Sequence, residues 1–339
     1  MSMSLIQYYR EHLQLRNPVL IAALAGWNDA ADSATTAIKF LIDRWKPVKI
    51  AEIDSEDFYV FTETRPIVRI VDGMQRSLVW PANQFSAHSL PEQERDIILY
   101  LGVEPQLKWH TFSECFLEVC RHFHVSEVIL LGAMLADIPH SLAVPITGSS
   151  STPELQERLR ELDIHSSGYE GPTGMIGVLQ DACRRANIPA ASLWAAAPHY
   201  LAATPNIKVT AALLTYVNSL LSLDLDLNEI QVDAVRFEEQ ITALVARDPE
   251  ASAYVRRLEE QIHALADEED EEDEEDDPED EEEPPVVETA HGPATDLDHP
   301  AGTGPLPSAD VLIRSVEELL RREREQGPPT DTDDSKDEG

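Results

Sequence analysis

The chain has 339 residues, of which 42% are hydrophobic, so it can bury the core of one large domain or of two ordinary ones. Its formal net charge of −37 excludes a protein that binds nucleic acid directly, because such binding depends on Lys and Arg to neutralise phosphates. No run of 18 apolar residues is present to cross a membrane, and the first 13 residues lack an export-signal pattern, so we expect a cytoplasmic protein.

The first sixth of the chain predicts a strand, a helix and a second strand. Residues 18–24 are continuously apolar, which is typical of a strand buried on both faces. Residues 30–44 then repeat small and apolar side chains at helical spacing, and Asn28 or Asp29 is expected to cap this helix. Residues 48–53 predict the next strand.

The following segments continue the alternation of strands and helices. Residues 67–71 and 77–80 alternate on either side of a turn and predict a β-hairpin. Residues 96–103 and 125–131 predict two further strands, and residues 111–123 form an amphipathic helical pattern between them. This order predicts an α/β fold, a three-layer αβα sandwich with a mostly parallel, mixed sheet.

The segment from 168 to 217 places glycine, proline and polar residues at each joint between two helices and a strand. Gly168, Gly171, Pro172 and Gly174 form a stiff loop, and a helical pattern begins near Thr173. A buried strand is predicted over 191–197, and His199 and Tyr200 follow its carboxyl end. Ligands of open α/β sheets bind at that edge, so this loop and His199 are expected to face one cleft.

The carboxyl-terminal half predicts a helix after Asn206 and then a helical pair broken at Asp248-Pro249, which packs on the domain or on a neighbouring subunit. Residues 267–283 contain 16 acidic side chains in 17 positions, which leaves a net charge of −13 on residues 1–266. Such a run repels itself and predicts a disordered linker. The predicted organisation is a core domain over 1–224, a helical extension over 225–266, an acidic and Pro/Gly-rich linker over 267–307, a short amphipathic helix over 308–326 and a tail over 327–339.

Four motifs resemble the actinobacterial branch of the proteasome assembly chaperone 2 family. They are LAGWNDAADSAT at 24–35, GYEGPTG at 168–174, SLWAAAPHY at 192–200 and TPN at 204–206, and the resemblance covers residues 5–265. It implies an αβα domain similar to phosphorylase/hydrolase-like folds, no established catalytic residues, and protein assembly as the role of eukaryotic and archaeal members. Its bacterial members have no assigned role.

The candidate site is a cleft for a ligand or a partner, and its residues are Trp27, Asn28, Asp29, Gly171, Thr173, Gly174, His199 and Tyr200. Each has a structural alternative, such as helix capping for Asp29 or a structural hydrogen bond for His199. Ser149, Ser150 and Ser151 form a predicted loop that either binds an anion or only connects two elements. The acidic cluster from Glu52 to Asp57 is more typical of a solvated loop than of a metal site.

Two hypotheses about function follow. The first is a non-enzymatic, assembly-chaperone-like or protein-interaction protein that binds other proteins and itself, as a trimer or dimer, with no catalytic residue, metal or cofactor. The second is a small-molecule-binding protein or a hydrolase/phosphorylase-like enzyme that uses the cleft, which fold-level analogy alone encourages. The acidic run is either a tether for a basic protein partner or a solvating spacer. Cys115, Cys120 and Cys183 fit reduced core thiols, because no Cys-x-x-Cys pair is present.

Overall fold

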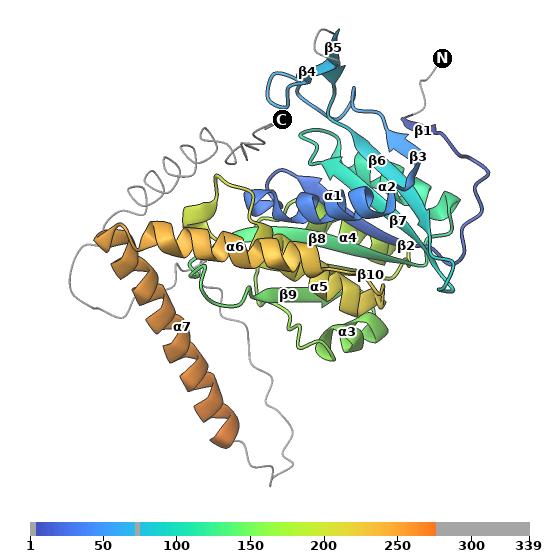
Figure 1. The fold of residues 1–339 in the computed structure, drawn as a ribbon. Helices are drawn as coiled ribbons and strands as arrows, with labels where there is room; N and C mark the ends of the chain where they lie inside the picture. The colour runs from blue at the N-terminus through green and yellow to red at the C-terminus, as the bar shows by residue number, and fades with distance from the viewer. Residues whose placement is uncertain (1–4, 72–74, 276–339) are drawn as a thin grey trace, which may run out of the picture.

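The computed structural model describes residues 5–71 and 75–275, and in it a mixed eight-stranded sheet lies between two layers of helices (Figure 1). The strand order is β1-β3-β6-β7-β2-β8-β10-β9, and the central strands β7, β2, β8 and β10 are parallel. The strands are β1 (Ile6–Tyr8), β2 (Val19–Ala25), β3 (Val48–Ile53), β6 (Asn83–Ser89), β7 (Asp96–Val103), β8 (Glu127–Ala136), β9 (Ile146–Ser150) and β10 (Ala190–Pro198). Five strands point the same way, so the sheet is mostly parallel, as the sequence predicts.

Seven helices occur in the described part of the chain. They are α1 (Ser33–Trp45), α2 (Trp109–His122), α3 (Pro153–Arg160), α4 (Met175–Arg185), α5 (Ile207–Leu221), α6 (Asn228–Val245) and α7 (Pro249–Glu275). Two 3₁₀ turns, η1 (Ala30–Asp32) and η2 (His199–Leu201), follow the carboxyl ends of β2 and β10. None of these helices is long and apolar enough to cross a membrane.

Side-chain alternation along the central strands separates the core into two halves. In β2, Val19, Ile21 and Ala23 pack toward α1, α3 and α5, whereas Leu20 and Leu24 pack toward α2 and α4. A strand covered on both faces has to be apolar throughout, which is why residues 18–24 show no polar alternation in the sequence. The buried cysteines belong to the α2 and α4 side, and burial raises the pKa of the Cys183 thiol to about 12.

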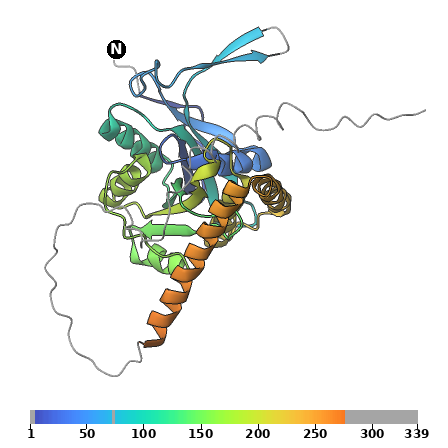
Figure 2. The ribbon, with the colours of Figure 1, turned by 90° about the vertical axis from the view of Figure 1, so that its left-hand side faces the viewer.

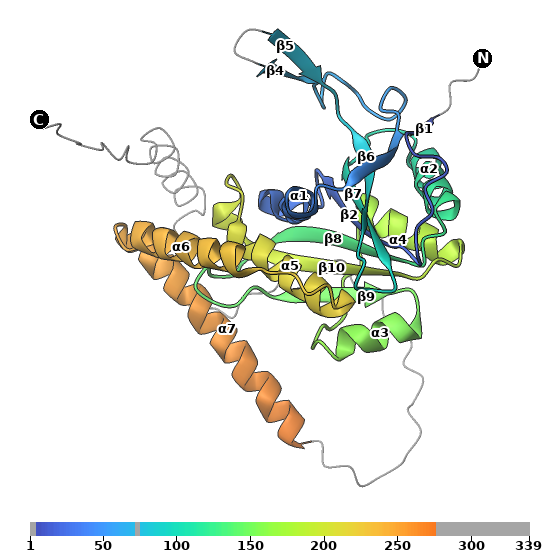
Figure 3. The ribbon, with the colours of Figure 1, turned by 45° about the vertical axis from the view of Figure 1, so that its right-hand side comes forward.

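The helical pair α6–α7 lies against the core. Ile230 and Ala234 of α6 join the same cluster as α5, and Ile241 and Leu244 form a separate cluster with Val255 of α7 and the 3₁₀ turn η2. Toward its carboxyl end, α7 stands away from the sheet (Figure 3). It continues to Glu275, nine residues into the segment that composition assigns to the linker, and the predicted helix over 308–326 lies outside the described residues.

The hairpin β4 (Ile67–Val71) and β5 (Gln75–Val79) forms its own two-stranded sheet, which projects away from the sandwich in two views (Figures 1 and 2). Its strands agree with the predicted hairpin. The antiparallel character of the main sheet comes instead from β1, β6 and β9. The helix α3, which the sequence did not predict, follows β9. Strand β9 corrects the expectation of a loop at Ser149 and Ser150, because both residues pair with β10.

Glycines in the central sheet allow close packing that a methyl group would disrupt. A Cβ at Gly132 of β8 would come within 2.6 Å of the Trp194 ring, whereas a Cβ at Gly168 would meet nothing within 4 Å. We expect Gly132→Ala to lower the free energy of unfolding by about 1–3 kcal/mol through overpacking, and Gly168→Ala to change it by less than about 0.5 kcal/mol. Urea unfolding followed by circular dichroism measures both, and equal effects of the two variants would contradict this packing.

Candidate functional site

A pocket of about 750 Å³ opens beyond the carboxyl ends of β2 and β8, on the side of the sheet that α4 covers. Its walls come from six segments, which are the residues after β2, the end of β8, strands β9 and β10, the loop 167–173 and helix α4. Sequence reasoning places a site at this edge because the carboxyl ends of parallel strands meet there. Of the sequence candidates, Trp27 and Thr173 line the pocket.

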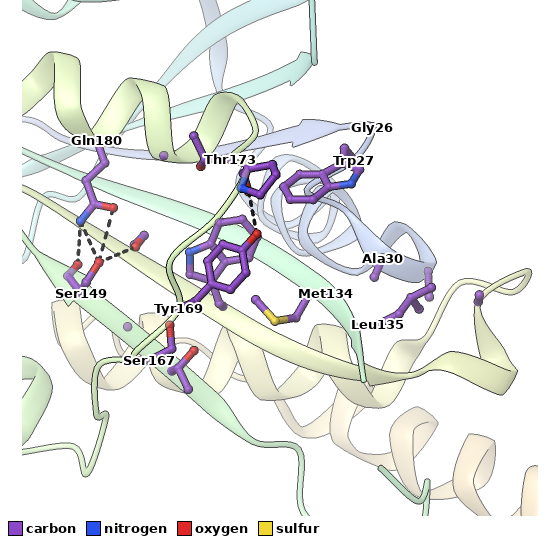
Figure 4. Close-up of a pocket in the computed structure, with 18 residues that line it drawn as sticks. Gly26, Trp27, Ala30, Met134, Leu135, Ser149, Ser167, Tyr169, Thr173 and Gln180 are labelled. Carbon is purple, nitrogen blue, oxygen red and sulfur yellow. Dashed lines mark hydrogen bonds between the residues drawn. The ribbon is translucent and has the colours of Figure 1, made fainter. Parts of the chain in front are cut away.

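The pocket has a polar end and an apolar end (Figure 4). At the polar end, Gln180 of α4 donates from Nε2 to the backbone oxygen of Ser149 at 3.1 Å and to its Oγ at 3.0 Å. The Ser149 hydroxyl also lies 3.2 Å from the hydroxyl of Ser192. At the apolar end lie Met134 and Leu135, both exposed. The hydroxyl groups of Thr147, Ser167, Tyr169 and Thr173 also belong to the lining, and the hydrogen-bonded group of Gln180, Ser149 and Ser192 marks one end.

Three aromatic side chains line the space between these ends. Trp27 and Tyr169 are each 64% exposed, and the Trp194 ring occupies the space above Gly132. The Tyr169 hydroxyl donates to the backbone oxygen of Pro172 at 2.9 Å, which folds the side chain back over its own loop. A Cβ on Gly171 would come within 2.5 Å of that hydroxyl, which explains a glycine there.

Glu104 holds two walls of the pocket together, and sequence reasoning missed it. Its Oε1 accepts hydrogen bonds from the Asn28 amide and from the backbone N–H of Met175, both at 2.7 Å, and its Oε2 accepts from the N–H of Trp27 at 3.1 Å. A Cβ at Gly174 would come within 2.3 Å of Asn28 and 2.7 Å of Glu104. The only signal in the sequence is an acidic residue directly after the buried strand 96–103.

Asp29 serves the helix that follows rather than the pocket. Its carboxylate accepts from the backbone N–H groups of Ala34 and Thr35, at 2.7 and 3.1 Å, and from the Thr35 hydroxyl at 2.6 Å. Burial raises its pKa above the usual carboxyl range, although these three donors oppose that shift. The capping role expected of Asn28 or Asp29 thus falls to Asp29, while Asp32 occupies the N-cap position with left-handed backbone angles.

His199 and Tyr200 lie away from the pocket and contact the carboxyl-terminal helices. His199 Nδ1 is 3.0 Å from the carboxylate of Asp137, and its Nε2 is 3.3 Å from the hydroxyl of Tyr254 on α7. Tyr200 is 1% exposed and belongs to the cluster under α6 and α7. The structure therefore separates His199 from the Gly171 loop that sequence reasoning placed with it, and only Ala202, after η2, reaches the pocket wall.

A second buried histidine, His140, was not singled out from the sequence. The Tyr200 hydroxyl accepts from the His140 backbone N–H at 2.7 Å and lies 2.7 Å from its Nδ1, and His140 Nε2 is 3.1 Å from the Thr242 hydroxyl. This arrangement suits a neutral imidazole that accepts at Nδ1 and donates at Nε2. Burial, and next the nearby Lys208 ammonium, lower the pKa of His140 to about 4.

Two of the four carboxylates in the acidic cluster from Glu52 to Asp57 form ion pairs. Glu52 pairs with Lys49 and accepts from the Tyr9 hydroxyl at 3.0 Å, and Asp57 pairs with Lys108 at 2.9 Å. Within residues 5–71 and 75–275, no three His, Cys, Asp or Glu side chains form a group that could hold a metal ion. Glu52 and Asp57 therefore form separate ion pairs, and Asp54 accepts from the backbone N–H of Glu56 at 2.8 Å.

Comparisons with known proteins agree on one family. The PAC2 family model matches residues 23–245. The chain is 41% identical to a proteasome-assembly chaperone homologue of known structure from Mycobacterium tuberculosis, with a TM-score of 0.63 over 70% of this chain and 99% of that chain. It is 40% identical to a PAC2 family protein from Streptomyces avermitilis, with a TM-score of 0.64 over the same shares.

A third solved structure shares the fold alone. It is an archaeal proteasome activator from Pyrococcus furiosus, which is 20% identical and has a TM-score of 0.57 over 70% of this chain and 97% of that chain. No curated protein matches the chain. The expected αβα architecture is therefore found both in the molecule and in its structural relatives.

The Glu104 carboxylate can be tested by truncation. We expect Glu104→Ala to lower the free energy of unfolding by about 2–4 kcal/mol, because it leaves the Asn28 amide and two backbone N–H groups without their acceptor. The exposed Glu56→Ala serves as the matched control, with an expected change below about 0.5 kcal/mol. Chemical denaturation measures both, and an unchanged midpoint for Glu104→Ala would contradict the role of this carboxylate.

The His140 pKa predicts a pH dependence of stability. Between pH 6.5 and about 4 the unfolded chain binds a proton that the folded chain excludes, so stability is full above pH 6.5 and falls as the pH drops toward 4. The expected loss is about 3 kcal/mol over that window.

Carboxyl groups also change the stability of the protein as they take up protons at low pH. Denaturation of the native chain and of His140→Gln at several pH values separates the contribution of His140 from theirs. The exposed His165→Gln should keep the native pH profile. If His140→Gln loses as much stability between pH 6.5 and 4 as the native chain, His140 is not the group responsible.

Proposed function

The chain belongs to the PAC2 family, and from that premise we propose that it is a non-catalytic protein-interaction protein with an assembly-chaperone-like role, working in the cytoplasm as a homo-oligomer. The observation that carries the proposal is the apolar surface of the β4–β5 hairpin. Support for the cytoplasm comes from the three buried free thiols, which suit a reducing compartment. The name of the Mycobacterium relative, a proteasome-assembly chaperone homologue, agrees with a role in protein assembly.

The hairpin presents apolar side chains on both faces. Val68, Ile70 and Leu78 share one face, and Ile67 pairs with Val79 on the other. All five, and Trp80 beyond them, are between 40% and 67% exposed. A two-stranded sheet is marginally stable by itself, and an apolar patch of this kind marks an interaction site. The hairpin thus has the properties of an arm that a partner covers.

Charge favours a second copy of this chain as that partner. The two strands carry Arg69 and Arg76 and no acidic residue, whereas residues 1–266 as a whole have a net charge of −13. A basic, apolar arm on an acidic domain is attracted to another such domain, because opposite potentials steer association. The other candidate occupant, an acidic client protein, fits the same charge pattern and is an outcome of the experiments below.

The pocket chemistry argues against the hydrolase or phosphorylase alternative. The pocket lining within the described residues contains no Asp, Glu, Lys, Arg, His or Cys. General acid–base catalysis needs a titratable side chain within hydrogen-bond reach of the reacting group, and the one tyrosine of the described lining, Tyr169, donates its hydroxyl hydrogen to the Pro172 oxygen. The same pocket favours ligand binding without catalysis as a second candidate function.

Removing apolar surface from the hairpin tests the proposed association. We expect the native chain to have a molar mass that is a multiple of 37.8 kDa by light scattering, and Val68→Ser/Leu78→Ser to weaken its association about 100-fold or more. Val232→Ser/Val235→Ser is the matched control, because these two valines are similarly exposed on α6. A monomeric native chain, or equal effects of the two double variants, would contradict the proposal of self-association.

Photo-crosslinking identifies what covers the arm. Benzoylphenylalanine placed at position 70 should capture a second copy of the chain in living cells, and the same group at position 235 should capture none. Capture of a different protein at position 70 alone would keep the protein-interaction role and replace the homo-oligomer, whereas capture of nothing would contradict both.

A further inference from the structure

The pocket described above carries a second function that does not depend on the hairpin. Its volume of about 750 Å³ lies within the range of small-molecule sites, which bury most of a drug-sized ligand. It also lies at the edge of the sheet where α/β proteins bind ligands. Both properties indicate a site for a small molecule rather than a gap between elements.

The absence of charge from the lining restricts the ligand. An ion in the pocket would lose hydration without meeting an opposite charge from the described residues that line it. An anion would also be opposed by the overall negative charge of the protein. The ligand therefore has to be neutral.

The lining also specifies the shape and polarity of the ligand. Trp27, Tyr169 and Trp194 offer ring faces and edges to a flat aromatic group. The Gln180 amide and the Ser149 and Ser192 hydroxyls at the opposite end both donate and accept, which matches a carboxamide or a carbonyl group. A planar ring that bears such a group can contact the aromatic side chains and the polar end at the same time.

The backbone next to the pocket adds an independent observation. Ala31, which lines the pocket, and Asp32 both have left-handed backbone angles, with φ of 52° and 51°. Such angles cost about 1–3 kcal/mol in a residue other than glycine and occur preferentially at ligand-binding sites. The backbone N–H of Asn206 holds the strained turn by donating to the Ala31 oxygen at 3.0 Å.

We propose that this pocket binds a neutral small molecule that carries a planar aromatic ring and a carboxamide or carbonyl group. The ring lies among Trp27, Tyr169 and Trp194, and the polar group exchanges hydrogen bonds with Gln180, Ser149 and Ser192. Binding at this position bridges the loop after β2, the loop 167–173 and α4. A bound ligand therefore fixes the relative positions of these three segments.

Benzamide, benzoate and benzamidinium test this proposal, because they share one shape and differ in charge. The chain has five tryptophans, and Trp27 and Trp194 line the pocket whereas Trp45, Trp80 and Trp109 do not. In full-length protein labelled with 5-fluorotryptophan, benzamide should shift the fluorine resonances of Trp27 and Trp194 saturably. A fragment of this size binds with a dissociation constant on the order of 1 mM. The other three tryptophans are internal controls.

The native pocket should bind benzamide in preference to benzamidinium, and a negative charge placed in the pocket should reverse this order. Gln180→Glu is expected to weaken benzamide binding at least threefold and to strengthen benzamidinium binding. Gln231→Glu, an exposed glutamine on α6, is the matched control and should leave both unchanged. If Gln180→Glu does not fold, as its fluorine spectrum would reveal, the three probes on the native chain decide the question.

Three results with the probes would overturn the proposal. They are no shift up to about 20 mM benzamide, shifts by benzoate or benzamidinium as large as those by benzamide, and shifts spread over all five tryptophans. A change of the Trp27 and Trp194 resonances on dilution without any probe would also overturn it, because it would assign the pocket to an interface between copies. The hairpin variants test self-association and not ligand binding. Either proposal can therefore be wrong while the other is right.

Discussion

The candidate site depends on the hydrogen bonds that the Glu104 carboxylate accepts. Glu104 accepts from the N–H of Trp27 after β2, from the Asn28 side chain and from the N–H of Met175 at the start of α4, and its own N–H donates to Ala25. One carboxylate side chain therefore fixes the end of β7, the loop after β2 and the first turn of α4. Hydrogen bonds to a carboxylate are short and strong, so the loops that form the pocket are held in place before a ligand arrives.

The protein has two surfaces on which other molecules can bind, the pocket and the β4–β5 hairpin, and they differ in chemistry. The pocket has a lining without charged side chains, three aromatic rings and a hydrogen-bonded polar group at one end, which suits a small molecule. The β4–β5 hairpin is apolar, bears two arginines and projects from the sandwich, which suits a protein. His199, Tyr254 and the cluster around Tyr200 meanwhile attach α6 and α7 to the core. His199, which the sequence places in the candidate cleft, thus belongs to a contact with the helix α7.

The sequence predicts the strands that a hydrophobic pattern marks, and it misses the strands that form only because a neighbouring strand pairs with them. Strands β2, β7, β8 and β10 are largely apolar runs that are buried over most of their length, so they are visible without a structure. Strands β1, β6 and β9 are short or polar and become strands only because neighbours pair with them. At the site, Trp27 and Thr173 follow from the joints between elements. Glu104, Tyr169 and Gln180 depend on how distant segments meet, which no local pattern records.

Hydrogen exchange at two protein concentrations shows whether a second copy of the chain covers the β4–β5 hairpin. A two-stranded sheet exposed on both faces opens easily, so its amides exchange fast unless a partner protects them. If a second copy covers the hairpin, the amides in 67–71 and 75–79 exchange slowly at high protein concentration and fast after dilution, with no change in β2 or β8. Fast exchange of the hairpin at every concentration would rule out the proposed self-association.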